Sequence, residues 1–230
     1  MLLPIRDENP PRHFPLVTVT LIVLNIIVFL WDRSGNPFGP RMVFTEMTMV
    51  PADVLNAFSG GPSDPLVTLF TCMFLHGGIA HLLGNMLFLW IFGNNVEDTF
   101  GPVFFILLYL AWGVAASALH IFVDPSSTIP TLGASGAIAG VLGSYMMLFP
   151  HARIDTLFWA FFVFVLEMPA WVLLGAWFVM QVLPGYQPPG VAAWAHAGGF
   201  VAGVVTVLLL GGRRRLLPRY RQLSWDSHDD

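Results

Sequence analysis

The sequence predicts an all-α polytopic membrane protein, with six transmembrane helices in one bundle and both termini in the cytoplasm. Of its 230 residues, 56% are hydrophobic and only 10% are charged, whereas a soluble domain has about 25% charged residues. The apolar residues are gathered in six long segments, and most arginines lie in the breaks on one side of them. These observations favour one helical membrane domain that uses nearly the whole chain.

Six segments come close to the roughly 20 apolar residues that a helix needs to cross a bilayer. They are residues 15–31, 79–96, 102–123, 133–149, 157–182 and 193–211. The longest break, residues 34–64, is expected to hold an amphipathic helix over residues 44–58 at the membrane surface. No segment shows a strand pattern. The predicted organisation is a cytoplasmic N-terminal segment (1–14), a membrane domain (15–211) and a cytoplasmic arginine-rich tail (212–230).

All ten basic residues are arginines, and their distribution predicts the orientation of the helices. With both termini inside, the cytoplasmic segments hold Arg6, Arg12, Arg153, Arg213, Arg214, Arg215, Arg219 and Arg221. Only Arg33 and Arg41 then fall outside, and basic residues are enriched in short cytoplasmic segments. The first span is expected to stay uncleaved, because Asp32 and Arg33 follow it instead of a small-residue cleavage site.

Four polar residues lie near the starts of the second, fourth and sixth spans, which all run from the outer to the inner side. His81 and Asn85 open the second span, Ser135 opens the fourth and His196 opens the sixth. The shared direction of these spans therefore predicts that the four side chains lie at a similar depth, about a turn below the outer surface. Polar groups at this depth are tolerated where they line water.

Glycines at four-residue spacing predict that the fourth and sixth spans pack closely. The pairs are Gly136 with Gly140 and Gly199 with Gly203. Small residues at this spacing let helix backbones approach each other, and on their own they indicate packing only. Because a serine side chain is short, Ser135 can reach the sixth span only if the two helices nearly touch.

The residue types at this depth match the parts of a hydrolytic site. A serine becomes a nucleophile when a base takes its proton, and His196 is the candidate base for Ser135. No acidic residue lies at the same depth, so a Ser–His dyad is expected instead of a triad. His81 and Asn85 are four residues apart and share a helical face. With the Ser135 amide, they can donate hydrogen bonds to an oxyanion.

Three motifs in order carry a resemblance to the rhomboid intramembrane serine proteases. Residues 76–85 read HGGIAHLLGN and fit the H-x4-H-x3-N pattern of that family. Residues 133–136 read GASG and fit G-x-S-G, and residues 195–203 read AHAGGFVAG and fit the histidine and glycine pattern of the last span. The resemblance covers about residues 14–211.

The resemblance implies a six-helix rhomboid-like bundle that cleaves single-pass transmembrane protein substrates near their extracytoplasmic end. It implies Ser135 as nucleophile, His196 as general base, and His81 and Asn85 as oxyanion donors. The residues implied in support are His76, Gly133, Gly136, Gly199 and Gly203. The family carboxylate at Glu97 would tie helices together, and the fifth span would be a mobile wall with a weak point at Pro169. The expected location is a bacterial plasma membrane, with membrane lipid as the surroundings.

Two positions depart from the pattern of that family. Val67 and Thr68 stand where many relatives have a Trp-Arg pair, which puts the anchoring of the first outer loop in question. Ala139 stands where some relatives have a tyrosine stacked on the base, so another residue has to support His196. Of the remaining polar residues, His120 is expected at the interface and Glu167 against a neighbouring helix or protonated. Gln181 is expected to touch substrate or to cap its helix.

Other functions fit the sequence less well. A catalytically silent rhomboid-like protein that binds transmembrane segments is the main alternative, although such proteins usually lack the serine or the histidine. A transporter would need polar groups through the full membrane depth. His76, His81 and His196 lack the H-E-x-x-H pattern and a nearby acid, so neither a metal nor any other cofactor is expected. The dispersed net charge of −4 indicates no nucleic-acid partner.

Overall fold

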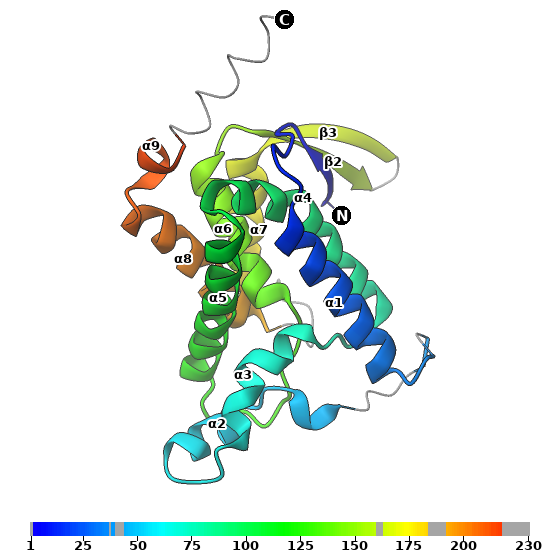
Figure 1. Cartoon of the computed structure of the whole chain (residues 1–230), viewed down its shortest axis with the longest axis vertical. Coiled ribbons are helices and arrows are strands. Elements are labelled where there is room, and N and C mark those ends of the chain that lie inside the picture. Colours follow the sequence, from blue (N-terminus) through cyan, green and yellow to red (C-terminus); the bar gives the residue numbers. More distant parts are fainter. Residues whose placement is uncertain (1, 37, 40–43, 160–162, 184–191, 218–230) are drawn as a thin grey trace, which may run out of the picture.

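The computed structural model describes residues 2–36, 38–39, 44–159, 163–183 and 192–217. Six helices form the body of the protein (Figure 1). They are α1 (Leu16–Asp32), α4 (Ile79–Phe100), α5 (Pro102–Val123), α6 (Ser135–Leu148), α7 (Ala170–Val182) and α8 (Ala193–Leu209). Helix α6 is the central one, because it contacts α4, α5, α7 and α8 and most of its residues are buried.

Five of the six expected spans coincide with helices of the body, within a few residues at each end. Among the described residues, α4 and α5 are the two helices that are both long enough and apolar enough to cross a membrane. The other apolar helices have 10–17 residues. The all-α prediction is therefore confirmed only in the coarser sense that the described part of the chain is mostly helical, and the six-span count stays a prediction.

The prediction of a helix across residues 157–182 is wrong in its first half, and so is the expectation that no strand is present. The chain forms an antiparallel sheet in the order β1 (Leu2–Asp7), β2 (Arg153–Trp159) and β3 (Val163–Pro169). Residues 157–169 are apolar except for Glu167, and many of them are aromatic or β-branched, so average hydropathy alone cannot separate a strand from a helix here. The partner of β2 also comes from the opposite end of the sequence, with Arg6 paired to Asp155.

This correction changes the surroundings of Glu167 and Pro169. Glu167 belongs to β3, its side chain is 57% exposed, and it accepts a hydrogen bond from Arg153 on the neighbouring strand (Nη1 to Oε2, 2.8 Å). It therefore does not lie in the middle of an apolar helix. Pro169 ends β3 and is the N-cap residue of α7, so it precedes the helix and does not interrupt one.

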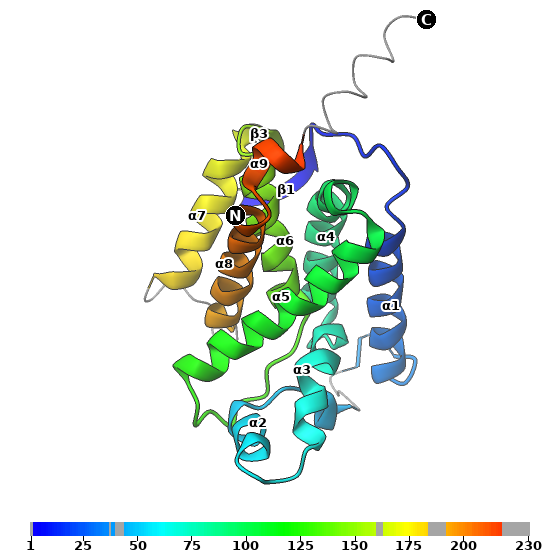
Figure 2. The same ribbon diagram turned by 60° about the vertical axis from the view of Figure 1, so that its left-hand side comes forward.

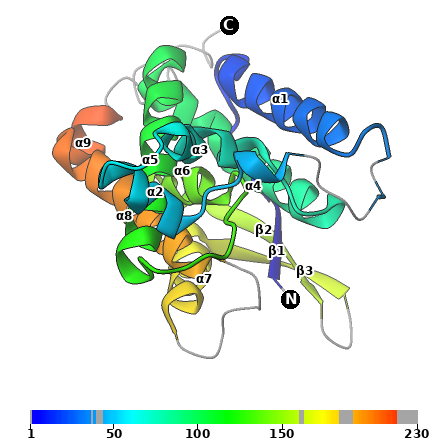
Figure 3. The same cartoon turned by 90° about the horizontal axis from the view of Figure 1, so that it is seen from below.

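The loop between α1 and α4, predicted on the outer side and called the outer loop below, is built from short helical turns instead of one amphipathic helix. Residues 44–58 form a 3₁₀ turn (Thr45–Met47) and the helix α2 (Pro51–Phe58). The backbone of Val50 between them is extended, so the two do not join into one helix. Two further 3₁₀ turns (Asp64–Val67 and Cys72–Phe74) flank the short helix α3 (Thr68–Thr71). These turns lie across one end of the helical body, as the view from below shows (Figure 3).

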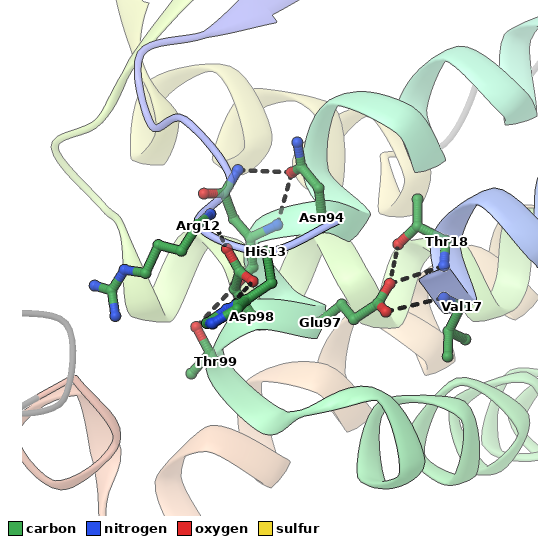
Figure 4. Close-up of polar contacts among 9 residues, drawn as sticks. Arg12, His13, Val17, Thr18, Asn94, Glu97, Asp98 and Thr99 are labelled. Carbon is green, nitrogen blue, oxygen red and sulfur yellow. Dashed lines mark hydrogen bonds and ion pairs between the residues drawn. The ribbon is translucent and has the colours of Figure 1, made fainter. Parts of the chain in front are cut away.

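The opposite end of the body carries the sheet and the short helix α9 (Gly212–Leu216), as two views show (Figures 1 and 2). Glu97 joins two helices at this end, as expected. Its carboxylate accepts hydrogen bonds from the backbone N–H groups of Val17 and Thr18 and from the Thr18 hydroxyl, at 2.8–2.9 Å (Figure 4). An acceptor at this place satisfies N–H groups that the first turn of α1 leaves unpaired.

Asp98 and Asp7 hold the N-terminal segment against the same end of the body. Asp98 accepts a hydrogen bond from the Arg12 backbone N–H (2.7 Å) and faces His13 (Figure 4). Asp7 Oδ2 accepts hydrogen bonds from the Tyr145 hydroxyl (2.7 Å) and the Asn95 amide (2.9 Å). Burial raises the pKa of the Asp7 carboxyl to about 6. The segment is thus packed onto the helical body through polar contacts as well as through β1.

Candidate active site

The candidate site lies where α4, α6 and α8 begin, at the end of the body that carries the outer-loop turns. Ser135 is the first residue of α6, His196 is in the first turn of α8, and His81 and Asn85 are in the first two turns of α4. Helix starts have N–H groups without intrahelical partners, which leaves the Ser135 amide available as a donor. The three helices therefore contribute their polar residues at one common end.

Ser135 and His196 are brought together. Ser135 Oγ and His196 Nε2 are 2.7 Å apart, which is hydrogen-bond distance, and both residues are partly buried. This contact depends on the close helix packing expected from the glycine spacing, which is present. A β-carbon on Gly199 would overlap the Gly136 carbonyl oxygen, and one on Gly203 would overlap that of Gly140. A short side chain can therefore bridge from α6 to α8.

The second ring nitrogen of His196 has a partner that the sequence did not single out for this role. His196 Nδ1 lies 2.8 Å from the side-chain oxygen of Gln181 in α7. Trp177, one turn earlier in α7, lies beside the imidazole with 5.7 Å between ring centroids. Gln181 and Trp177 thus contact the base, whereas Ala139 has no aromatic ring to stack on it. In the sequence, the one indication of this partner is that Gln181 is a polar residue at the end of the predicted fifth span.

His81, Asn85 and Gly133 complete the surroundings of Ser135. Gly133 has φ of +120°, and a β-carbon there would lie 2.9 Å from His81 Nε2 and 3.6 Å from Ser135 Oγ. The absence of a side chain at this position therefore leaves the space between His81 and Ser135 open. The Asn85 amide nitrogen is buried and has no hydrogen-bond partner among the residues that the structure describes. A buried donor without a partner can serve a ligand.

The outer loop beside the site is anchored by Arg33, which sequence reasoning used only for orientation. Its guanidinium donates hydrogen bonds to the carbonyl oxygens of Gly77 (2.5 Å) and His76 (3.3 Å), and to that of Gly39 (2.5 Å). His76 is fully buried, and its ring meets that of His81 edge-on at 5.2 Å. Arg33 thus holds the segment that leads into α4, whereas Val67 is 61% exposed.

A cavity of about 710 Å³ joins these residues. Its lining includes His81, Asn85, Ser135 and His196, together with small residues of α4, α5 and α6 and with the loop that connects α5 to α6. His120 was expected at the membrane interface, and the structure shows that it also lines the cavity. The volume lies within the usual range of ligand pockets. Among the described residues, no group of three His, Cys, Asp or Glu side chains is placed to hold a metal ion.

The fold and the site together define a class: a helical protein of apolar composition in which a serine and a histidine from two tightly packed helices meet in a cavity. The chain belongs to the rhomboid family, because the family model described as the Rhomboid domain matches residues 63–213. This family is embedded in membranes and is known for intramembrane serine proteases. The family prediction is thereby confirmed.

Several curated proteins are similar to this chain. RHOMBOID-like protein 12, mitochondrial, from Arabidopsis thaliana is 29% identical over 86% of this chain and 60% of its own length. Rhomboid protein 1, mitochondrial, from Saccharomyces cerevisiae is 33% identical over 60% of this chain and 40% of its own. Rhomboid protease GluP from Bacillus subtilis is 34% identical over 57% of this chain and 24% of its own. The chain therefore spans less than two thirds of each of these relatives.

Proposed function

We propose that the protein is an intramembrane serine endopeptidase that hydrolyses peptide bonds of single-pass membrane proteins near the extracytoplasmic face. The observation that carries this proposal is the 2.7 Å contact between Ser135 Oγ and His196 Nε2 inside the cavity. A serine whose proton is accepted by a neighbouring imidazole is an activated nucleophile. Similarity to a Bacillus subtilis rhomboid protease supports the same reaction.

The first half of the proposed reaction cleaves the peptide bond. Ser135 Oγ attacks the scissile carbonyl carbon while His196 Nε2 takes the hydroxyl proton. The carbonyl oxygen becomes an oxyanion, which accepts hydrogen bonds from the Ser135 amide and from His81 and Asn85. The C–N bond then breaks, His196 returns its proton to the leaving amine, and the acyl group stays on Ser135.

The second half of the reaction releases the acyl group by hydrolysis. His196 takes a proton from a water molecule, whose oxygen attacks the ester carbon. The ester bond to Oγ breaks, and the proton returns to Ser135. The proposed path for water runs beside the loop between α5 and α6, whose polar residues Asp124 and Ser127 line the same cavity. The serine and histidine are thereby restored.

We also propose that six segments cross the membrane and that both termini are cytoplasmic. The sheet with β1 and the helix α9 lie at one end of the body (Figures 1 and 2). The residues of the candidate site lie at the other end, where α4, α6 and α8 begin. With the arginine distribution, this arrangement supports a site near the extracytoplasmic face. We propose a bacterial plasma membrane as the location. Fractionation of the source cells tests this point, since two similar proteins carry mitochondrial names.

The test is cleavage of tagged single-span reporters by purified protein in lipid vesicles. We expect Ser135→Ala and His196→Ala to lower the rate by about 10³-fold or more. Ser144→Ala is the matched control, because Ser144 lies in the same helix but bonds to the Gly203 carbonyl and does not line the cavity. Equal rates for wild type and Ser135→Ala would end the proposal. Binding of reporters without cleavage would favour the silent transmembrane-segment binder.

A further inference from the structure

The side-chain amide of Gln181 is positioned to fix the protonation of His196. Its oxygen lies 2.8 Å from His196 Nδ1, across the contact between α7 and α8. Its nitrogen lies 3.5 Å from the carbonyl oxygen of Trp177, one turn earlier in the same helix. The amide N–H group points toward that carbonyl, so the amide oxygen is the atom that faces the imidazole.

An oxygen beside Nδ1 selects one of the two neutral forms of the ring. The amide oxygen only accepts hydrogen bonds, so Nδ1 must carry the proton in this contact. Nε2 is then unprotonated and can accept the proton of the Ser135 hydroxyl, 2.7 Å away. The other tautomer would set the Nδ1 lone pair against the amide oxygen and leave Ser135 without an acceptor. The contact therefore favours the form that can act as base.

Trp177 restricts the same ring from another direction. The indole and the imidazole are inclined by 33°, with 5.7 Å between their centroids, and the indole also packs on Phe200 of α8. Trp177 and Gln181 are four residues apart on α7 and thus share a helical face. Trp177 limits the tilt of the imidazole, and Gln181 limits its rotation and fixes which nitrogen is protonated.

A neutral amide suits this position better than a carboxylate. Among the described residues that line the cavity, Asp124 is the only acidic one, and it belongs to the loop between α5 and α6. An ionised side chain between apolar helices is costly unless it is paired. An amide supplies the required acceptor without a buried charge. This accounts physically for a Ser–His pair that has no acid beside its base in the part of the chain that the structure describes.

We propose that Gln181 is a positioning residue for the reaction, holding His196 in the tautomer with a protonated Nδ1. This inference rests on the proposed function and deepens it, because it assigns the orienting part of the site to α7. Gln181 acts through His196 and takes no part in bond making or breaking. Its loss should therefore slow the chemical step and leave the binding of substrate nearly unchanged.

The experiment compares three variants in lipid. Gln181→Leu removes the acceptor at similar size, Gln181→Glu keeps an oxygen acceptor, and Met180→Leu changes the neighbouring residue, which is 41% exposed. We expect Gln181→Leu to lower kcat by about 10- to 100-fold, which is less than the 10²–10⁴-fold that the base itself supplies, because His196 is still present. KM should stay close to its wild-type value. Gln181→Glu should keep most of the activity, because its carboxylate still accepts a hydrogen bond from His196 Nδ1, but it should lower stability, because a carboxylate between apolar helices is costly. Met180→Leu should match wild type.

The spectroscopic readout is the ¹⁵N chemical shift of the two His196 nitrogens, assigned by comparison with His196→Ala. Wild type and Gln181→Glu should show a protonated Nδ1, and Gln181→Leu should show a mixture of tautomers. A structural role alone would lower kcat without changing the tautomer, and that result overturns the proposal. Wild-type kcat in Gln181→Leu overturns it as well, while the proposed function stands.

An inactive wild type would separate the two proposals. If no reporter is cut, the rate at which a fluorophosphonate modifies Ser135 replaces kcat in the comparison. Slower modification together with a tautomer mixture in Gln181→Leu supports the role of Gln181 even then. An unchanged modification rate or an unchanged tautomer overturns that role.

Discussion

The backbones of Gly199 and Gly136 touch, because a β-carbon on Gly199 would overlap the Gly136 carbonyl oxygen. The same relationship recurs one turn further along, between Gly203 and Gly140. Two successive contacts of this kind set the distance between α8 and α6, and this distance lets Ser135 reach His196. Backbone proximity is thus part of the candidate site, and side chains added at this contact should affect activity as well as stability.

Gly199→Ala should destabilise the protein by about 1–3 kcal/mol, the usual cost of overpacking, and should reduce cleavage strongly. The added methyl group forces α8 away from α6 and lengthens the contact between serine and histidine. Thermal unfolding in detergent and reporter cleavage in lipid measure the two effects. Gly175→Ala is the control, because a β-carbon there meets no atom within 4 Å. Wild-type cleavage by Gly199→Ala would show that the spacing does not matter.

Asn85→Ala should lower kcat by about 10²–10³-fold, the effect of removing one oxyanion donor. The Asn85 amide nitrogen has no partner among the described residues, so it is free to donate to an oxyanion that forms during the reaction. Because that oxygen is charged only in the transition state, KM should change little. Steady-state kinetics on one reporter separates the two constants. A raised KM with unchanged kcat would assign Asn85 to substrate binding instead.

Arg33→Met should destabilise the protein by about 2–3 kcal/mol, since hydrogen bonds from a charged group contribute more than neutral ones. The side chain of Arg33 is 3% exposed and holds the carbonyl groups of His76 and Gly77. Faster hydrogen exchange over residues 72–78 should accompany the loss. Arg6→Met is the matched control, because its side chain is 78% exposed and its ion pair with Asp155 contributes little. Equal effects of the two variants would contradict the anchoring role.

Stability should depend on pH through Asp7, which burial gives a pKa of about 6 instead of 3.8. The folded state binds this proton more tightly than the unfolded state. The stabilisation from Asp7 is therefore complete below pH 3.8 and is lost as the pH rises through about 6. Asp7→Asn should remove this part of the pH dependence. Unfolding temperatures of both proteins between pH 4 and 7 test it, and parallel curves would refute it.

The positions of the four polar residues could be predicted because they follow from helix direction. Ser135, His196, His81 and Asn85 each lie near a helix start, and alternate spans share a direction, so a linear pattern was sufficient. The glycine spacing likewise indicated the contact between α6 and α8, since a small residue has few other effects on a helix face.

The sheet and the partner of His196 could not be predicted, for different physical reasons. The end of β2 and all of β3 lie in an apolar segment, and β1 comes from more than 140 residues away, so a local pattern cannot predict their pairing. The contact of Gln181 with His196 depends on the rotation of α7 against α8, which neither helix reveals alone. The charge of Arg33 can be read from the sequence, but the carbonyl groups that it binds come near it only through the conformation of the loop.

The central claim is that His196 activates Ser135 as a nucleophile, and mapping of a covalent adduct tests it most directly. Protein in lipid is treated with a fluorophosphonate, and the modified residue is identified by peptide mass spectrometry in wild type, His196→Ala and Ser144→Ala. We predict one adduct, on Ser135, in wild type and in Ser144→Ala, and none in His196→Ala. Equal modification of Ser135 with and without His196, or modification of other serines only, would contradict the claim.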